Sequence, residues 1–320
     1  MNKSKKEERL GLTKVNKWGD IMTIIVYNSS QDIVVEFQDE WRETKHSDYK
    51  TFKEGNIINP HTYNQRIGMI NTNGQGHVMK VVDYIDYNNV IIEFQDDHHE
   101  RIKCTWGAFE RGTVKNHYAP FVFGVGMVGV KYPATKNGKR TKEYTAWSSM
   151  LARCYTKSII NGKNHYHRYE DVEVCSEWLL FENFYEWLHG QENFDEWILL
   201  DKGVVDKDIL IKGNKIYSPD TCCLIPQNVN MLFSKSNKTR GKYPIGVTYK
   251  TRDDVYEVQC NVNGKETYLG RRNTPEQGFL LYKSFKEDLI KQVAQEEYSK
   301  GSIAKKCYEA MMKYEVEITD

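Results

Sequence analysis

Three features are missing from this 320-residue sequence, and each absence excludes a class of protein. No apolar run approaches the roughly 20 residues that a membrane-spanning helix needs, and the first nine residues lack the apolar stretch of a secretory signal. The seven cysteines include no CxxC pair, which argues for reduced thiols and against a disulfide framework. We therefore expect a soluble protein of the cytoplasm that does not contact a membrane.

The composition that remains is typical of a folded protein with several domains. Hydrophobic residues make up 39% of the chain and charged residues 28%, which is the globular range and excludes a mainly disordered, collagen-like or coiled-coil chain. At roughly 100–200 residues per domain, this length predicts two or three domains.

The net charge of +1 conceals blocks of opposite sign. Residues 131–168 hold nine Lys and Arg against one acid, residues 170–220 hold four lysines against thirteen acids, and residues 235–272 hold nine basic residues against four acids. Two basic blocks on either side of an acidic one would suit a protein whose basic residues bind phosphates and whose acidic residues bind a metal between them. Solvated charged faces would give the same pattern, so charge alone leaves both interpretations open.

The first third of the chain repeats itself at an offset of 57 residues without a gap; the sequence Glu-Phe-Gln-Asp at 36–39, for example, recurs at 93–96. Short β-branched runs bounded by Asn, Asp and Gly predict an antiparallel β-unit in each copy, at 1–61 and at 62–120. We expect small barrels of the Src-homology or Tudor type, or other five-stranded meanders. Their balanced charge favours contact with a protein, such as a host protein, over non-specific DNA binding.

Residues 121–234 form the central segment. The Gly-rich stretch at 123–130 lacks the Lys-Ser/Thr of a phosphate loop, so we interpret it as a linker or strand. Apolar residues at spacings of three and four predict a helix at 144–155, and a second aromatic cluster at 175–188 predicts further core. Residues 204–230 then predict a strand, a Lys-Gly-Asn-Lys turn, a second short strand and a helix that begins near Pro226.

This strand-strand-helix order, together with Asp206-Lys207-Asp208-Ile209 and Tyr217-Ser218-Pro219, resembles the HNH-like proteins common in phages and mobile elements. The active family holds a divalent metal against the scissile phosphate and activates water with a histidine. The resemblance implies Asp206 as the first metal-binding carboxylate, Asn214 as a polar residue of the loop, and Asn228 or Asn230 as the last ligand, a set that suits Mg²⁺ or Mn²⁺.

The sequence departs from the HNH pattern at the position of the general base, where Lys207 replaces the histidine. The flanking carboxylates of Asp206 and Asp208 stabilise the protonated lysine, which makes Lys207 a poor base, although it could still bind a phosphate. Cleavage, binding alone and a turn with solvated charges all stay open. A zinc site is the weaker alternative, because the cysteines and histidines of this segment form no CxxC or HxxxH pair; they are Cys154, His165, His167, Cys175, Cys222 and Cys223. We interpret the cysteines as buried thiols instead.

Residues 235–320 predict a C-terminal module of three β-runs and a helix that begins at Pro275 with Thr274 as its N-cap. With Gly264-Lys265 and Tyr268-Leu269-Gly270 ahead of that helix, the region 241–295 resembles the Apetala/ethylene-response DNA-binding domain, whose sheet lies in the major groove. The resemblance implies that seven side chains contact DNA, namely Lys250, Arg252, Gln259, Asn261, Lys265, Arg271 and Arg272. Strand alternation places Tyr256 on the core side instead, and a solvated polar face would show the same alternation.

Together these patterns predict an α+β, multidomain protein that binds double-stranded DNA. The first hypothesis is a homing-type HNH endonuclease that hydrolyses phosphodiesters with a divalent metal. The alternative is a catalytically silent protein with the same fold that binds DNA or a host protein, such as a phage antagonist of host defence.

Overall fold

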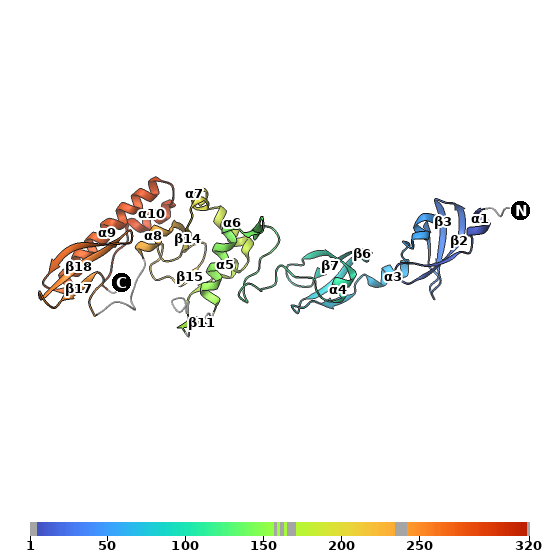
Figure 1. The fold of residues 1–320 in the computed structure, drawn as a ribbon, viewed down its shortest axis with the longest axis horizontal. Coiled ribbons are helices and arrows are strands. Elements are labelled where there is room, and N and C mark those ends of the chain that lie inside the picture. Colours follow the sequence, from blue (N-terminus) through green and yellow to red (C-terminus); the bar gives the residue numbers. More distant parts are fainter. Residues whose placement is uncertain (1–4, 157–158, 161–162, 165–170, 234–241, 319–320) are drawn as a thin grey trace. The chain divides into compact units, whose positions relative to one another are not determined.

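The computed structural model of the chain describes residues 5–156, 159–160, 163–164, 171–233 and 242–318. It is a mixed α and β structure with several small sheets (Figure 1), as the sequence predicted. The chain forms two compact units, Met1–Ala119 and Pro120–Asp320, and each is described by itself. Within the described ranges, no helix combines the length and apolarity needed to cross a membrane.

The first unit holds the two sequence repeats, and each repeat is a four-stranded antiparallel sheet with its strands in chain order. The first copy consists of α1 (Lys5–Arg9), β1 (Thr13–Val15), β2 (Ile21–Ser29), β3 (Asp32–Phe37), β4 (Thr44–Ser47) and α2 (Tyr49–Glu54). The second consists of α3 (Pro60–Arg66), β5 (Ile70–Thr72), β6 (Val78–Asp86), β7 (Asn89–Phe94), β8 (Arg101–Cys104) and α4 (Trp106–Glu110). The expected barrels are wrong, because four short strands leave an edge on either side of each described sheet.

The 57-residue offset holds in the side-chain contacts of the two copies. Asn59 Nδ2 donates to Asp39 Oδ2 at 2.6 Å, and the equivalent Asn116 Nδ2 donates to Asp96 Oδ2 at 2.6 Å. Arg9 lies over the ring of Tyr49, and the equivalent arginine of the second copy lies over the equivalent aromatic ring. The repeat therefore preserves a packing scheme as well as a strand order.

The second unit is built on an aromatic core around α5 (Lys142–Tyr155). The expected helical face is confirmed, since Trp147, Met150 and Leu151 are fully buried. The indole Nε1 of Trp147 donates to the carbonyl of Trp178 at 2.7 Å. Around α5 lie β9 (Thr135–Lys136), β10 (Lys139–Arg140), β11 (Ile159–Ile160), β12 (Lys163–Asn164), β13 (Glu173–Val174), η2 (Ser176–Leu179), α6 (Phe181–His189) and α7 (Phe194–Leu199).

The Gly-rich stretch packs against this core as irregular chain with two isolated β-bridges. A Cβ at Gly126 would overlap the side chains of Leu151 and Trp147. Gly129 has a φ of +73°, and its close approach lets the buried carboxylate of Glu182 accept the backbone N–H groups of the next two residues, each at 2.7 Å. The glycines serve packing rather than phosphate binding.

The expected strand-strand-helix unit forms, but with different strands. β14 (Gly203–Asp206) pairs antiparallel with β16 (Cys223–Pro226), and α8 (Gln227–Leu232) follows at once. The short β15 (Ile216–Tyr217), which comes directly after the Lys-Gly-Asn-Lys segment, pairs in parallel with β13 instead. The two paired strands are therefore joined by a long connection, residues 207–222, which contains β15, in place of the predicted tight turn.

The C-terminal module is a three-stranded antiparallel sheet of β17 (Val247–Lys250), β18 (Val255–Val262) and β19 (Lys265–Arg272). One face packs against α9 (Pro275–Ser299), which runs along it in Figure 1. Thr274 Oγ1 accepts the backbone N–H of Gln277 at 3.3 Å, so the predicted N-cap is confirmed. The last helix is α10 (Lys305–Met312), which packs with α9, α8 and β16 around a second apolar core.

Candidate functional site

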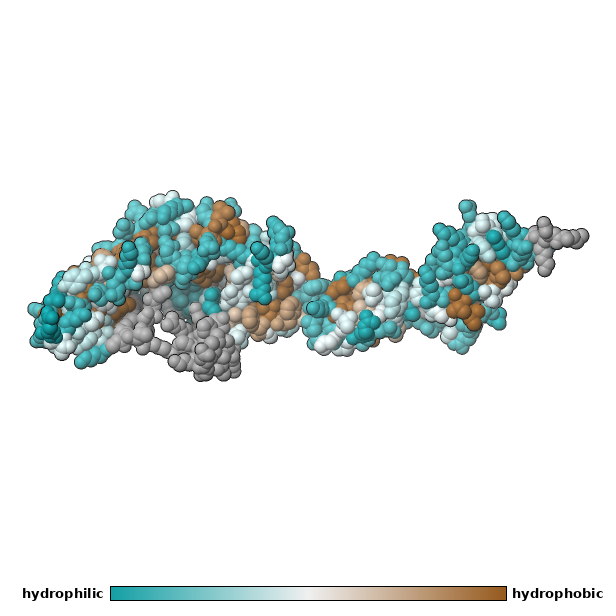
Figure 2. All heavy atoms as spheres, in the orientation of Figure 1, coloured by the Kyte–Doolittle hydropathy of each residue, from teal (hydrophilic) through white to brown (hydrophobic). Residues whose placement is uncertain are grey.

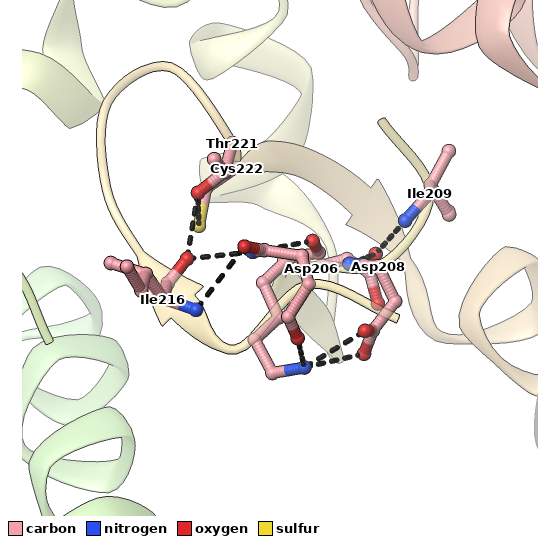
Figure 3. Close-up of polar contacts among 8 residues, drawn as sticks. Asp206, Asp208, Ile209, Ile216, Thr221 and Cys222 are labelled. Atoms are coloured by element: carbon pink, nitrogen blue, oxygen red, sulfur yellow. Dashed lines mark hydrogen bonds and ion pairs between the residues drawn. The ribbon is translucent and has the colours of Figure 1, made fainter. Parts of the chain in front are cut away.

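Asp206 stands at the end of β14, where the HNH resemblance places the first metal ligand (Figure 3). Its Oδ1 accepts the backbone N–H groups of Asp208 and Ile209, both at 2.8 Å. Burial raises the pKa of this carboxyl above its ordinary value, and the two N–H donors counteract only part of that effect. The side chain thus caps the loop that follows β14.

Lys207 is buried, and its ammonium is held by groups of the same loop. Nζ donates to Asp208 Oδ1 at 2.8 Å, to Asp208 Oδ2 at 2.9 Å and to the carbonyl of Asn214 at 2.6 Å, and it lies 5.9 Å from the centroid of the Tyr217 ring. Three hydrogen bonds to oxygen are all that an ammonium can donate. With its three donors used on oxygens of the same loop, the Lys207 ammonium offers no proton acceptor at the position of the general base.

Asn214 closes the same loop through its amide. Its Nδ2 donates to the carbonyls of Lys207 at 2.9 Å and Ile216 at 2.7 Å, and its Oδ1 accepts the backbone N–H of Ile216 at 3.2 Å. Asn214 and Lys207 thus each donate to the backbone carbonyl of the other, and these bonds hold the loop together.

The helix residues expected to complete a metal site lie elsewhere. Asn228 is exposed on α8, and its Nδ2 donates to Glu297 Oε1 on α9 at 3.3 Å. Asn230 is half-buried on the same helix. In the part of the chain that the structure describes, no hydrogen bond joins either amide to Asp206. The predicted metal set of Asp206, Asn228 and Asn230 is therefore not brought together by side-chain contacts.

The donor groups around Asp206 do not fit a Mg²⁺ or Mn²⁺ ion. Such an ion takes about six oxygen ligands, with one or two protein carboxylates among them. One oxygen of Asp206 already accepts two N–H groups, and both oxygens of Asp208 face the ammonium of Lys207. Among the described residues, no group of three or more His, Cys, Asp or Glu side chains could hold a metal.

The cysteines of the central segment are thiols in apolar surroundings. Burial raises the pKa of Cys154 to about 11 and that of Cys222 to about 12, far above the range of a reactive or metal-binding thiolate. His165 and His167 lie outside the described residues. The interpretation of the cysteines as buried thiols fits these environments.

The sheet of the C-terminal module has one apolar and one polar face, and we call the face opposite α9 the outward face. Tyr256 packs with the apolar core on the α9 side, as predicted. Gln259 and Asn261 alternate with the buried Val258 and Cys260 and so lie on the outward face. Tyr268 pairs across the ladder with Gln259 and is exposed on the same face.

Two of the predicted DNA-contacting cations share one acid on the outward face. Lys250 Nζ lies 3.1 Å from Glu257 Oε2, and Arg271 Nη2 lies 2.9 Å from Glu257 Oε1. Hydrogen bonds from Lys250 and then Arg271 lower the pKa of Glu257. Arg271 also contacts Asp253, which Arg252 contacts in turn. Sequence reasoning named the cations but not Glu257, although cross-strand neighbours in the predicted sheet could have indicated it.

The other predicted contacts occupy different positions. Lys265 pairs with Val262 and Arg272 pairs with Tyr256, so both belong to the side of the sheet that faces α9, although both are exposed. Asn261 Oδ1 accepts the backbone N–H of Gly264 at 2.9 Å, which stabilises the β18–β19 turn. The structure thus places five of the seven predicted residues on or beside the outward face, and these are Lys250, Arg252, Gln259, Asn261 and Arg271.

An exposed basic hairpin, β9–β10, was missed by the sequence analysis. Lys136, Lys139 and Arg140 flank a turn whose central residues, Asn137 and Gly138, have φ angles of 53° and 74°. An Asn-Gly pair between two extended segments is the strongest short-range signal for such a hairpin. Its three cations are exposed and belong to the strongly basic block of the sequence.

Both N-terminal repeats expose apolar side chains at equivalent positions. Leu10, Leu12 and Ile21 of the first copy correspond to Ile67, Met69 and Val78 of the second, and all six are exposed. Figure 2 shows hydrophobic side chains gathered at the surface of this unit among hydrophilic ones. Exposed apolar patches of this kind are typical of protein-binding surfaces.

Comparison of the chain with protein-family models, with curated proteins and with solved structures found no match. The two resemblances drawn from the sequence therefore stay predictions, and the function must be argued from the geometry of this chain alone.

Proposed function

We propose that this protein binds duplex DNA through the outward face of its C-terminal sheet and does not cut it. The observation that carries the proposal is the split of one three-stranded sheet into an apolar face covered by α9 and a polar face that presents Lys250, Gln259 and Arg271. A twisted sheet of this size fits the major groove, where amide and guanidinium groups read base edges. The basic β9–β10 hairpin is a second candidate for phosphate contact.

The loop after β14 supports the absence of cleavage. Lys207 replaces the expected base and is fully engaged by Asp208 and Asn214, while Asp206 caps the loop. A nuclease of this type needs a proton acceptor and an accessible metal position at this point. The β14–β16–α8 unit then serves as a structural centre that carries the DNA-binding module.

Fluorescence anisotropy with a labelled random-sequence duplex of 30 base pairs tests the binding. We expect salt-sensitive binding, and replacement of Lys250 by Gln should reduce the slope of log affinity on log salt by about 1. Lys291→Gln serves as the matched control, because Lys291 belongs to α9, the helix that covers the opposite face of the sheet. No binding at low salt would refute the proposal.

A plasmid assay separates binding from cleavage. Supercoiled DNA incubated with Mg²⁺ or Mn²⁺ should stay intact with both the wild type and Asp206→Ala. Nicking by the wild type that is lost in Asp206→Ala would overturn the proposal in favour of an HNH endonuclease with an unusual base.

The repeated apolar patches favour protein binding as a second function, carried by the first unit. The same three positions stay apolar and exposed in both copies, which a solvated spacer would not need. Crosslinking of the purified protein in a lysate of its host would identify the protein partner. Replacement of Leu12 and Met69 by Ser should abolish that crosslink without changing DNA binding.

A further inference from the structure

A cavity of about 630 Å³ lies within the second unit between α8, α9, the β18–β19 turn and the chain that follows α10. Its walls combine polar groups with apolar side chains, which include Leu232, Phe233, Ile245, Tyr282 and Ile290. This volume is in the range of small-molecule binding pockets, which combine apolar walls with a few polar groups. None of the predicted DNA-binding cations lines it.

Among the described residues that line this cavity, Lys286 is the one that carries a charge. The residue is only 8% exposed, and no hydrogen bond or ion pair joins its ammonium to any residue in the described ranges. Burial lowers the pKa of Lys286, with the Cys260 thiol as the neighbouring titratable group. Burying an unpaired ammonium is unfavourable, so a lysine kept at such a position calls for an anionic partner.

The neighbouring charges on α9 cannot supply that partner. Glu287 Oε1 accepts the backbone N–H of Val316 at 2.8 Å and contacts Lys283 Nζ at 2.8 Å. Lys283 Nζ in turn donates to the carbonyl of Val316 at 2.8 Å. These bonds also fix the chain at Val316 as one wall of the cavity. The pocket is thus formed in advance, and a ligand need not order the chain when it binds.

We propose that this cavity binds a small monocarboxylate with an aromatic or branched aliphatic body. The carboxylate pairs with Lys286, and the apolar body lies against the side chains of Leu232, Tyr282 and Ile290. A single cation in the described wall favours a single negative charge, and Asn263 adds a polar residue at the β18–β19 side. This proposal is independent of DNA binding.

Calorimetric titration of the full-length protein with 2-naphthoate and with its neutral counterpart 2-naphthalenemethanol tests the role of the charge. Replacement of Lys286 by Met keeps an unbranched side chain only one atom shorter and removes the ammonium. We expect naphthoate to bind Lys286→Met about tenfold more weakly than the wild type or worse, because a charge-assisted hydrogen bond is lost. The alcohol should bind both proteins alike, and Lys291→Met should behave as the wild type with both ligands.

A second variant keeps the test decisive if Lys286→Met fails to fold. Met231 lines the cavity and is 53% exposed, so Met231→Trp should narrow the cavity while Lys286 stays in place. We expect this variant to lose both ligands. Equal naphthoate affinity in the wild type and Lys286→Met, unchanged naphthoate binding in Met231→Trp, or no naphthoate binding to the wild type would each overturn the proposal.

Discussion

Glu257 lies between the two cations that are best placed to meet DNA, and replacing it by Gln tests the outward face directly. In the wild type this carboxylate pairs with Lys250 at 3.1 Å and with Arg271 at 2.9 Å. Glu257→Gln keeps the shape of the side chain and removes one negative charge from the binding face; because one carboxylate balances one of the two positive charges, the change frees one cation. We therefore expect tighter DNA binding that is also more sensitive to salt.

The size of the effect follows from counterion release. Each cation that newly neutralises a phosphate adds about 0.9 to the slope of log affinity on log salt, so the one freed cation adds about 0.9. Between 50 and 200 mM salt, the variant should therefore lose roughly 3- to 4-fold more affinity than the wild type loses over the same range. Fluorescence anisotropy at four salt concentrations measures both slopes.

Glu266→Gln is the matched control for this experiment. Glu266 pairs across the ladder with Asn261 on the same face, but it forms no ion pair with any described residue. Its replacement removes the same charge and frees no cation, so the slope should stay close to that of the wild type. Identical slopes for Glu257→Gln, Glu266→Gln and the wild type, with folding confirmed by circular dichroism, would show that the outward face does not contact DNA.

Three further predictions concern the second unit. Gly129→Ala should lower the free energy of unfolding in urea by about 2 kcal/mol or more, because its Cβ would overlap Glu182 at a φ of +73°; Gly138→Ala, which has a similar φ and open space, should cost less, and equal losses would contradict the packing argument. Burial raises the pKa of Asp206 above its ordinary 3.8. The folded protein therefore keeps the proton of Asp206 to a higher pH than the unfolded chain does, and the charge on Asp206 opposes folding increasingly as the pH rises from 3.8 through the raised pKa. Asp206→Asn, which keeps the accepting oxygen, should gain stability relative to the wild type between pH 4 and pH 7, and urea unfolding at several pH values would show a relative loss if this reasoning is wrong. Cys222, with a pKa of about 12, should resist iodoacetamide at pH 8 in the folded protein and react after unfolding, as mass spectrometry of the labelled peptides can establish; rapid labelling in the folded state would contradict its burial.

Local patterns in the sequence predicted much of the secondary structure. One of the short β-branched runs, Asp32–Phe37, forms β3, and the offset of 57 residues reappears in matching Asp–Asn hydrogen bonds. Thr274 and Pro275 correctly marked the start of α9. Such features depend on residues within a few positions of one another, so their signals survive without knowledge of the fold.

The pairing of strands was less predictable. Residues 203–206 pair with 223–226 across a loop, whereas the nearer strand at 216–217 pairs with 173–174. Several short apolar runs could serve as the partner strand, and the choice depends on which arrangement buries the aromatic core around Trp147. The absence of barrels could not be predicted for the same reason, because no local signal indicates whether a four-stranded sheet closes into a barrel.

The sequence by itself determined the repeats, the main helices, the alternation of the C-terminal sheet and the presence of Lys207 where a base was expected. Only the tertiary structure decided that Asn228 contacts Glu297, 69 residues away, instead of Asp206, and that Lys286 lines a cavity without a partner in the described chain. Periodicity determines which face of a helix or strand a residue occupies, but the packing of elements distant in the sequence determines which residues that face contacts.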